Sequence, residues 1–170
     1  KLKPSPIGVA GDLALIQLAN YDEHLHLLAG CDLVIEAIAE RLDWKLDLYT
    51  KVAPHLAPGA IVASNTSGLS IDGMLEGRSD AFKKVFFGTH FFNPVRYMHL
   101  LEVIPSKYSD PAFVADTCDF SDRVLGKGVV LCRDTPNFIA NRIGIGEMLL
   151  TFAATKAGSY TIEEVDTLNA

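Results

Sequence analysis

Short apolar runs alternate with longer stretches of helical periodicity along this chain, and this alternation constrains the fold more than any other feature. Five runs are rich in the β-branched and aromatic residues of buried strands. They lie at residues 32–37, 61–64, 85–87, 100–104 and 129–132. Helical periodicity fills residues 41–56 and 110–125 between them. Such a succession is typical of the α/β class with a largely parallel sheet.

The segment before the first of these runs gives a weaker pattern. Residues 16–20 are predicted to form a strand and residues 22–28 a short helix. Within the helix expected at residues 41–56, Trp44, Leu48 and Val52 follow one another at intervals of four. This spacing places them on one helical face and predicts that all three pack in the core.

The pattern changes to uninterrupted helix after residue 133. Thr135 suits an N-cap and Pro136 the first helical position, so we expect a long helix to open there and to run through Phe152. Residues 159–161 separate it from a final helix. A chain of 170 residues is short for two complete domains, so we expect one domain and part of another.

The stretch GTHFFNPVRYMHLLE at residues 88–102 carries the clearest chemical signal. It places His90 at the end of an apolar strand and Glu102 inside the next apolar run, where an unpaired charge would be costly. Paired with His90, this carboxylate would fix the imidazole tautomer and stabilise the imidazolium, as a general base requires. The pair alone is equally consistent with a structural histidine. Gly88 is expected to allow a close approach to the backbone.

Polar residues gather where the predicted strands end. Residues 36–40, residues 64–67 and His90 all follow or close a strand, and Asn141 comes from the helix after the last one. Ligands of open parallel sheets bind beyond the carboxyl ends of the strands. We therefore expect these four groups to meet at one pocket.

Composition excludes several classes of function. The net charge of −6 and the pI near 5.3 argue against a surface for nucleic acid or anionic membranes. No apolar run approaches the ~20 residues of a membrane span. The three cysteines are odd in number and widely spaced, so we expect neither disulfides nor a metal site. These features favour a soluble protein of a reducing compartment, either the cytoplasm or an organelle matrix.

Several motifs together resemble the L-3-hydroxyacyl-CoA dehydrogenases of fatty-acid β-oxidation. The motifs are VIEAIAE (34–40), SNTSGLSI (64–71), GTHFFNP (88–94), LLEVI (100–104) and DTPNFIANRI (134–143). The resemblance implies oxidation of the 3-hydroxyl of an acyl-CoA to a ketone, with hydride transfer to NAD. It also implies a partial Rossmann-like NAD-binding domain at residues 1–133 and the beginning of a C-terminal helical domain at residues 134–170.

The resemblance assigns roles to residues that match the motifs. His90 is similar to the family's base and Glu102 to the carboxylate that orients it, while Ser67 and Asn141 match the polar pair near the reacting oxygen. The positions matched to cofactor contacts are Glu40, Lys45, Ser67 and Asn93. A solvated surface lysine is the alternative for Lys45.

The chain also departs from the family pattern. The glycine-rich GxGxxG turn is absent, so we expect the first βαβ unit to be missing and NAD to bind weakly or not at all. The activity of the isolated chain is thus left open. Asn137 stands in DTPNF where relatives usually carry glycine, and asparagine tolerates left-handed backbone better than most residues.

Three readings of the function remain. The chain could be the dehydrogenase portion of a multifunctional β-oxidation protein, or a sister enzyme that acts on 3-hydroxybutyryl-CoA. A third reading is a structural or binding relative without turnover, like the lens crystallins of this superfamily. For the first two, the expected partners are an acyl-CoA substrate and either a second copy of the chain or a β-oxidation complex.

Overall fold

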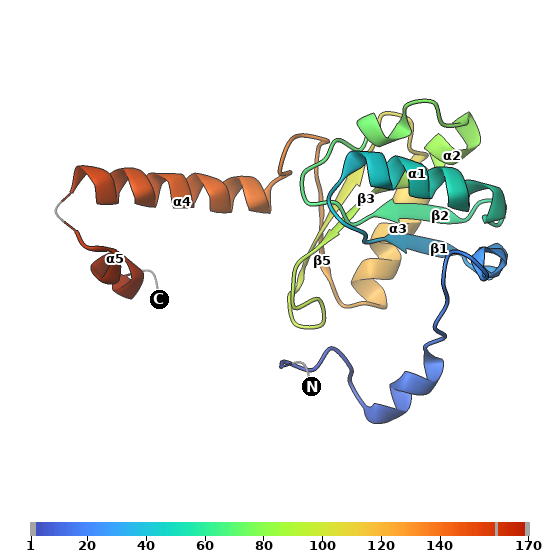
Figure 1. The fold of residues 1–170 in the computed structure, drawn as a ribbon, viewed down its shortest axis with the longest axis horizontal. Helices are drawn as coiled ribbons and strands as arrows, with labels where there is room; N and C mark the ends of the chain where they lie inside the picture. The colour runs from blue at the N-terminus through green and yellow to red at the C-terminus, as the bar shows by residue number, and fades with distance from the viewer. Residues whose placement is uncertain (1–2, 159, 169–170) are drawn as a thin grey trace.

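A five-stranded mixed sheet organises the chain in the computed structural model, which describes residues 3–158 and 160–168 (Figure 1). The strands lie in sequence order: β1 (Leu33–Glu36), β2 (Ile61–Ser64), β3 (Phe86–Phe91), β4 (Leu100–Pro105) and β5 (Gly128–Leu131). Only β3 and β4 pair antiparallel among these neighbours, and the other three pairs are parallel. The predicted α/β class with a largely parallel sheet is therefore confirmed.

Helices cover both faces of this sheet. On one face lie α1 (Leu42–Val52), the 3-10 turn η4 (Gly73–Leu75) and α2 (Asp80–Lys84), and on the other lies α3 (Pro111–Arg123) (Figure 1). A short 3-10 turn, η3 (Ala53–His55), continues α1. The Asp110 carboxylate caps α3 by accepting from the amide of Ala112, and Pro111 occupies the first turn. None of the helices in the described ranges is long and apolar enough to cross a membrane.

Two apolar clusters form because successive strand residues point to opposite faces. Phe86 packs with Tyr49 of α1 on one face, and Phe87 packs with Val114 of α3 on the other. His90 lies four residues after Phe86 and therefore points to the face that carries α1.

The N-terminal segment differs from its prediction. Residues 16–20 form no strand and are exposed, and the expected helix at 22–28 is a 3-10 helix, η2 (Leu25–Gly30), preceded by η1 (Ala10–Leu15). A strand needs a neighbour to pair its backbone groups. Within the described residues β1 pairs with β2 alone, so residues 16–20 have no ladder partner.

The predicted core position of Trp44 is wrong, whereas Leu48 and Val52 are buried as expected. Trp44 is 51% exposed, and the Arg41 guanidinium lies 4.7 Å from the centre of its ring. Residues four apart on a helix are rotated by about 40°, so Trp44 and Val52 differ by about 80°. The three side chains therefore do not fully share one face, and Trp44 lies outside the core that buries Leu48 and Val52.

The long helix begins later than predicted. The segment at Thr135 and Pro136 is a turn, and α4 (Ala140–Ala157) starts five residues after the expected N-cap. Asn137 and Phe138 have φ angles of 63° and 44°, which a right-handed helix cannot contain. The left-handed backbone at Asn137 explains why glycine suits this position. Beyond it, α4 extends away from the sheet, and α5 (Ile162–Leu168) follows (Figure 1).

Gly88 gives a prediction about packing beneath the site. A Cβ at this position would lie 2.9 Å from Ile71 Cδ1 and 3.0 Å from Ile104 Cδ1. We expect Gly88→Ala to lower the free energy of unfolding by about 1–3 kcal/mol, the usual cost of overpacking a core. Gly144→Ala, in α4 with nothing within 4 Å, is the control and is expected to stabilise by about 0.5–1 kcal/mol. Urea unfolding of the intact protein measures both, and equal effects would contradict this packing.

Candidate active site

His90 and Glu102 form a buried pair across β3 and β4. They are direct partners in the antiparallel register, and His90 Nδ1 lies 2.7 Å from Glu102 Oε2. His90 is 4% exposed and Glu102 is 1% exposed. Among the described residues, only the Nδ1 side of the ring is hydrogen-bonded, so Nε2 is available to a ligand. The pair thus has the arrangement of a base with its orienting carboxylate.

The second oxygen of Glu102 holds the start of α4. Glu102 Oε1 accepts from the backbone amides of Ile139 at 3.0 Å and Ala140 at 2.8 Å. One carboxylate therefore fixes both the imidazole and the first turn of the long helix. Burial is the main cause that raises the pKa of the nearby Cys132 thiol to about 12, and the negative charge of Glu102 adds to the increase.

Two aromatic rings pack against the imidazole of His90. The Phe92 ring centre lies 4.4 Å from that of His90, and the Phe138 ring centre lies 5.7 Å away. Phe138 is 2% exposed, since the left-handed turn at residues 137–138 directs it into the core. These rings limit the imidazole to a narrow range of orientations.

A second group forms around the loop that carries Ser67. Glu40 Oε1 accepts from the Thr66 hydroxyl at 2.6 Å, the Ser67 amide at 2.9 Å and the Gly68 amide at 3.1 Å. Asn141 Nδ2 donates to the Ser67 carbonyl at 3.3 Å. Three of the predicted site residues, Glu40, Ser67 and Asn141, are therefore brought together.

The Glu40 contacts give a prediction about pH. Partial burial opposes ionisation, but the hydrogen bonds and the Lys45 charge outweigh it, so the pKa of Glu40 is lowered from 4.5. Its stabilising effect is fully present above about pH 4.5 and is lost as pH falls through the lowered folded-state pKa. We therefore expect the stability difference between wild type and Glu40→Gln to shrink from pH 7 to pH 3 in denaturant unfolding of the intact protein. A constant difference would contradict this role of the charge.

Lys45 is a buried, paired lysine, so the alternative of a solvated surface lysine is wrong. It is 0% exposed, and its Nζ lies 2.6 Å from Glu36 Oε1 and 3.6 Å from Glu40 Oε2. Glu36 also accepts from the hydroxyls of Tyr49 and Ser64. Burial is the main cause that raises the pKa of Tyr49 far above its usual range. The carboxyl end of β1 is thereby fixed to α1 and β2.

Asn93 and Asn65 lie in the loops that follow β3 and β2. Asn93 lies exposed in the loop after β3, and no side-chain hydrogen bond joins it to the Glu40 group within the described residues. Asn65 belongs to residues 64–67, which the sequence predicts at the pocket, but no role of its own is predicted for it. Its Oδ1 accepts from the Phe91 amide at 2.9 Å and so ties the end of β2 to the strand end that carries His90. Its place directly after a predicted strand was the available signal.

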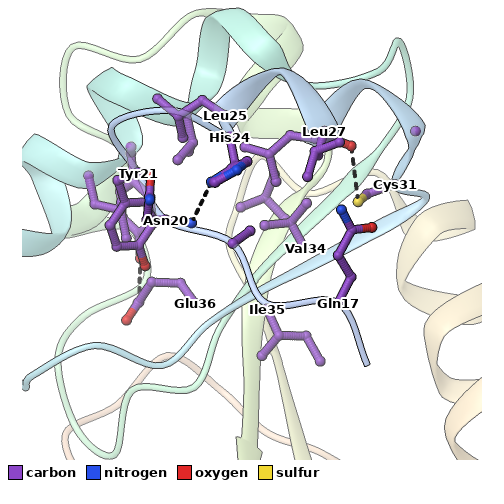
Figure 2. A pocket seen from close by; sticks show the side chains of 17 residues that line it. Gln17, Asn20, Tyr21, His24, Leu25, Leu27, Cys31, Val34, Ile35 and Glu36 are labelled. Carbon is purple, nitrogen blue, oxygen red and sulfur yellow. Dashed lines mark hydrogen bonds between the residues drawn. The ribbon is translucent and has the colours of Figure 1, made fainter. Parts of the chain in front are cut away.

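The described part of the chain also contains a mainly apolar cleft of about 610 Å³ away from the His90 pair. Figure 2 shows Leu25 and Leu27 of η2 on one side of it and Val34 of β1 on the other, with Glu36 at one end. Neither His90 nor Ser67 lines this cleft. Within the described residues, no group of three or more His, Cys, Asp or Glu side chains is placed to hold a metal ion.

The amino-acid sequence and the fold of this chain are similar to those of known proteins. The family model described as "3-hydroxyacyl-CoA dehydrogenase, NAD binding domain" matches residues 11–135. A Bacillus subtilis protein named "Probable 3-hydroxyacyl-CoA dehydrogenase" is 46% identical over 99% of this chain and 21% of its own length. A Rickettsia felis protein, whose name describes a fatty acid oxidation complex trifunctional enzyme, is 42% identical over 97% of this chain and 23% of its own.

A solved structure shares the fold. The (S)-3-hydroxybutyryl-CoA dehydrogenase PaaH1 from Ralstonia eutropha superposes with a TM-score of 0.79 at 31% identity. The match covers 91% of this chain and 53% of the Ralstonia protein. The chain thus spans about half the length of this relative and less than a quarter of the Bacillus and Rickettsia proteins.

Proposed function

This chain belongs to the 3-hydroxyacyl-CoA dehydrogenase family, and from that premise we propose that the intact protein oxidises an L-3-hydroxyacyl-CoA to the 3-oxoacyl-CoA in fatty-acid β-oxidation. The observation that carries the proposal is the buried His90 and Glu102 pair, whose Nδ1 to Oε2 distance is 2.7 Å. This pair leaves Nε2 of the imidazole available to a hydroxyl proton.

The residues act on the proton and on the reacting oxygen. His90 Nε2 takes the hydroxyl proton, and the Glu102 carboxylate stabilises the imidazolium that forms. Ser67 and Asn141, which lie next to one another, hold the substrate oxygen and polarise the developing carbonyl. Phe92 and Phe138 pack against the imidazole and limit its orientation.

The side chains at the sheet edge suit the nicotinamide half of NAD. The Glu40 side chain is held by three hydrogen bonds yet is 43% exposed, and Ser67 and Asn93 are also exposed. Lys45 lies behind Glu40. We assign all four residues to the cofactor site, Glu40, Ser67 and Asn93 as contacts of the nicotinamide half and the buried Lys45 as the cation that holds Glu40 there. Bound NAD supplies the hydride acceptor for the reaction.

We also propose how this chain fits into the intact protein. Residues 1–133 form part of the NAD-binding domain, and residues 134–170 begin a helical domain. The apolar side chains that α4 exposes support an assembly as a homodimer or within a multifunctional enzyme. Ile143, Leu150 and Phe152 are 65%, 74% and 61% exposed. Free Cys31, Cys118 and Cys132 support a reducing location, in the cytoplasm or an organelle matrix.

The test is NADH formation by the intact protein with L-3-hydroxyacyl-CoA substrates of increasing chain length. Turnover of the L but not the D enantiomer supports the proposal, and no turnover by folded protein contradicts it. The likeness to the Ralstonia enzyme favours 3-hydroxybutyryl-CoA as a second candidate substrate. A kcat/KM that is highest for the four-carbon substrate would select that alternative.

A further inference from the structure

Asp134 lies outside the set of residues assigned above, yet its carboxylate accepts three hydrogen bonds from the end of the Ser67 loop. Oδ1 accepts from the Ile71 amide at 2.9 Å. Oδ2 accepts from the Asp72 amide at 2.8 Å and from the Ser70 hydroxyl at 2.9 Å. These contacts join the segment after β5 to the loop after β2, which lies more than sixty residues earlier in the chain.

The same segment contacts the loop again near Ser67. Asn141 Nδ2 donates to the Ser67 carbonyl. Asn137 Oδ1 approaches Gly68 so closely that a Cβ there would lie 2.8 Å from it. The residues from Asp134 to Asn141 therefore follow the Ser67 loop along its length, and glycine at position 68 makes room for them.

Two carboxylates consequently hold the loop from opposite ends. Glu40 binds the Thr66, Ser67 and Gly68 end, and Asp134 binds the Ser70, Ile71 and Asp72 end, with three hydrogen bonds each. Hydrogen bonds to a charged acceptor are the stronger kind. Ser67 itself is exposed, so these contacts, rather than core packing, set its position.

We propose that Asp134 is a positioning residue for the reaction, which fixes the Ser67 loop and thereby the hydroxyl that holds the substrate oxygen. This inference rests on the proposed function for its catalytic consequence. The hydrogen bonds of the Asp134 carboxylate go to Ser70, Ile71 and Asp72, and none joins it to the His90 pair or to the predicted cofactor contacts. It acts through the loop.

The test replaces Asp134 with asparagine in the intact protein. Asparagine keeps one acceptor oxygen but presents an NH₂ group to backbone donors that need an acceptor. We expect kcat/KM for the hydroxyacyl-CoA to fall roughly 10- to 100-fold, the scale of a small misplacement of a catalytic group. Asp122→Asn is the matched control, since Asp122 is exposed on α3 and its carboxylate has no hydrogen bond or ion pair with the described residues.

A double-mutant cycle with Ser67→Ala separates positioning from general stability. If Asp134 acts through Ser67, its substitution costs much less activity once the Ser67 hydroxyl is gone. Equal fold-losses in the wild-type and Ser67→Ala backgrounds would overturn the inference, as would full activity of Asp134→Asn.

Hydrogen exchange gives a readout that does not depend on turnover. Asp134→Asn should speed exchange of the Ser67 and Gly68 amides, whereas Asp122→Asn should leave it unchanged. Unchanged exchange at these amides in Asp134→Asn would overturn the inference even in an inactive protein. An inactive wild type with faster exchange in the variant would instead refute the proposed function, while the hold of Asp134 on the Ser67 loop would stand.

Discussion

Replacing His90 with alanine is expected to lower turnover by about 10²- to 10⁴-fold, the range for loss of a general base. The imidazole is the group that takes the hydroxyl proton, and alanine offers no substitute. Because Glu40, Lys45 and Asn93 remain, binding of NADH should change little. Steady-state kinetics and NADH titration of the intact protein measure the two effects separately.

Two further variants make this result specific. His90→Gln keeps a hydrogen-bond donor within reach of Glu102 but cannot take a proton, so it should be as inactive as His90→Ala and better folded. His26→Ala, an exposed histidine on η2, should leave turnover unchanged. Parallel losses of folding and activity across the His90 variants would identify a structural histidine instead.

Removal of the Glu102 carboxylate should affect both stability and turnover. In Glu102→Ala, the His90 Nδ1 group and the amides of Ile139 and Ala140 lose their acceptor. A buried donor left without a partner costs roughly 1–3 kcal/mol. We therefore expect a large fall in the free energy of unfolding and a turnover close to that of the His90 variants.

Glu102→Gln provides the graded comparison. It keeps one acceptor oxygen and nearly the same volume, so it should retain more stability than Glu102→Ala while still losing the charge that stabilises the imidazolium. Denaturant unfolding and steady-state kinetics of the intact protein test both variants. Full stability in Glu102→Ala would show that α4 does not depend on this carboxylate.

The sequence predicts the His90 and Glu102 pair because an unpaired charge inside an apolar strand is costly, whatever the exact geometry of the sheet. A charge inside the run of Leu101, Glu102 and Val103 had to have a partner, and the structure places His90 directly opposite on the adjacent strand. The strand ends likewise predict that Glu40, Ser67 and Asn141 lie at one edge of the sheet, and in the structure Glu40 and Asn141 both hydrogen-bond to the Ser67 backbone. The strands themselves follow from their apolar composition.

The sequence could not predict features that depend on rotation or on distant contacts. Trp44 lies outside the core because side chains four residues apart are rotated by about 40° around the helix axis. The start of α4 depends on the left-handed backbone at Asn137 and Phe138. Thr135 and Pro136 favour an earlier helix start, so the sequence does not indicate this backbone conformation. The contacts of Asp134 span more than sixty residues and leave no periodic signal.

The first measurement to make is a crystal structure of the intact protein with NAD and a 3-oxoacyl-CoA, a pair between which no hydride can pass. We expect the 3-oxygen to lie within about 2.6–3.2 Å of His90 Nε2, with Ser67 and Asn141 beside it. A 3-oxygen bound away from His90, in a complex whose protein turns over in solution, would contradict the central claim that this histidine is the base.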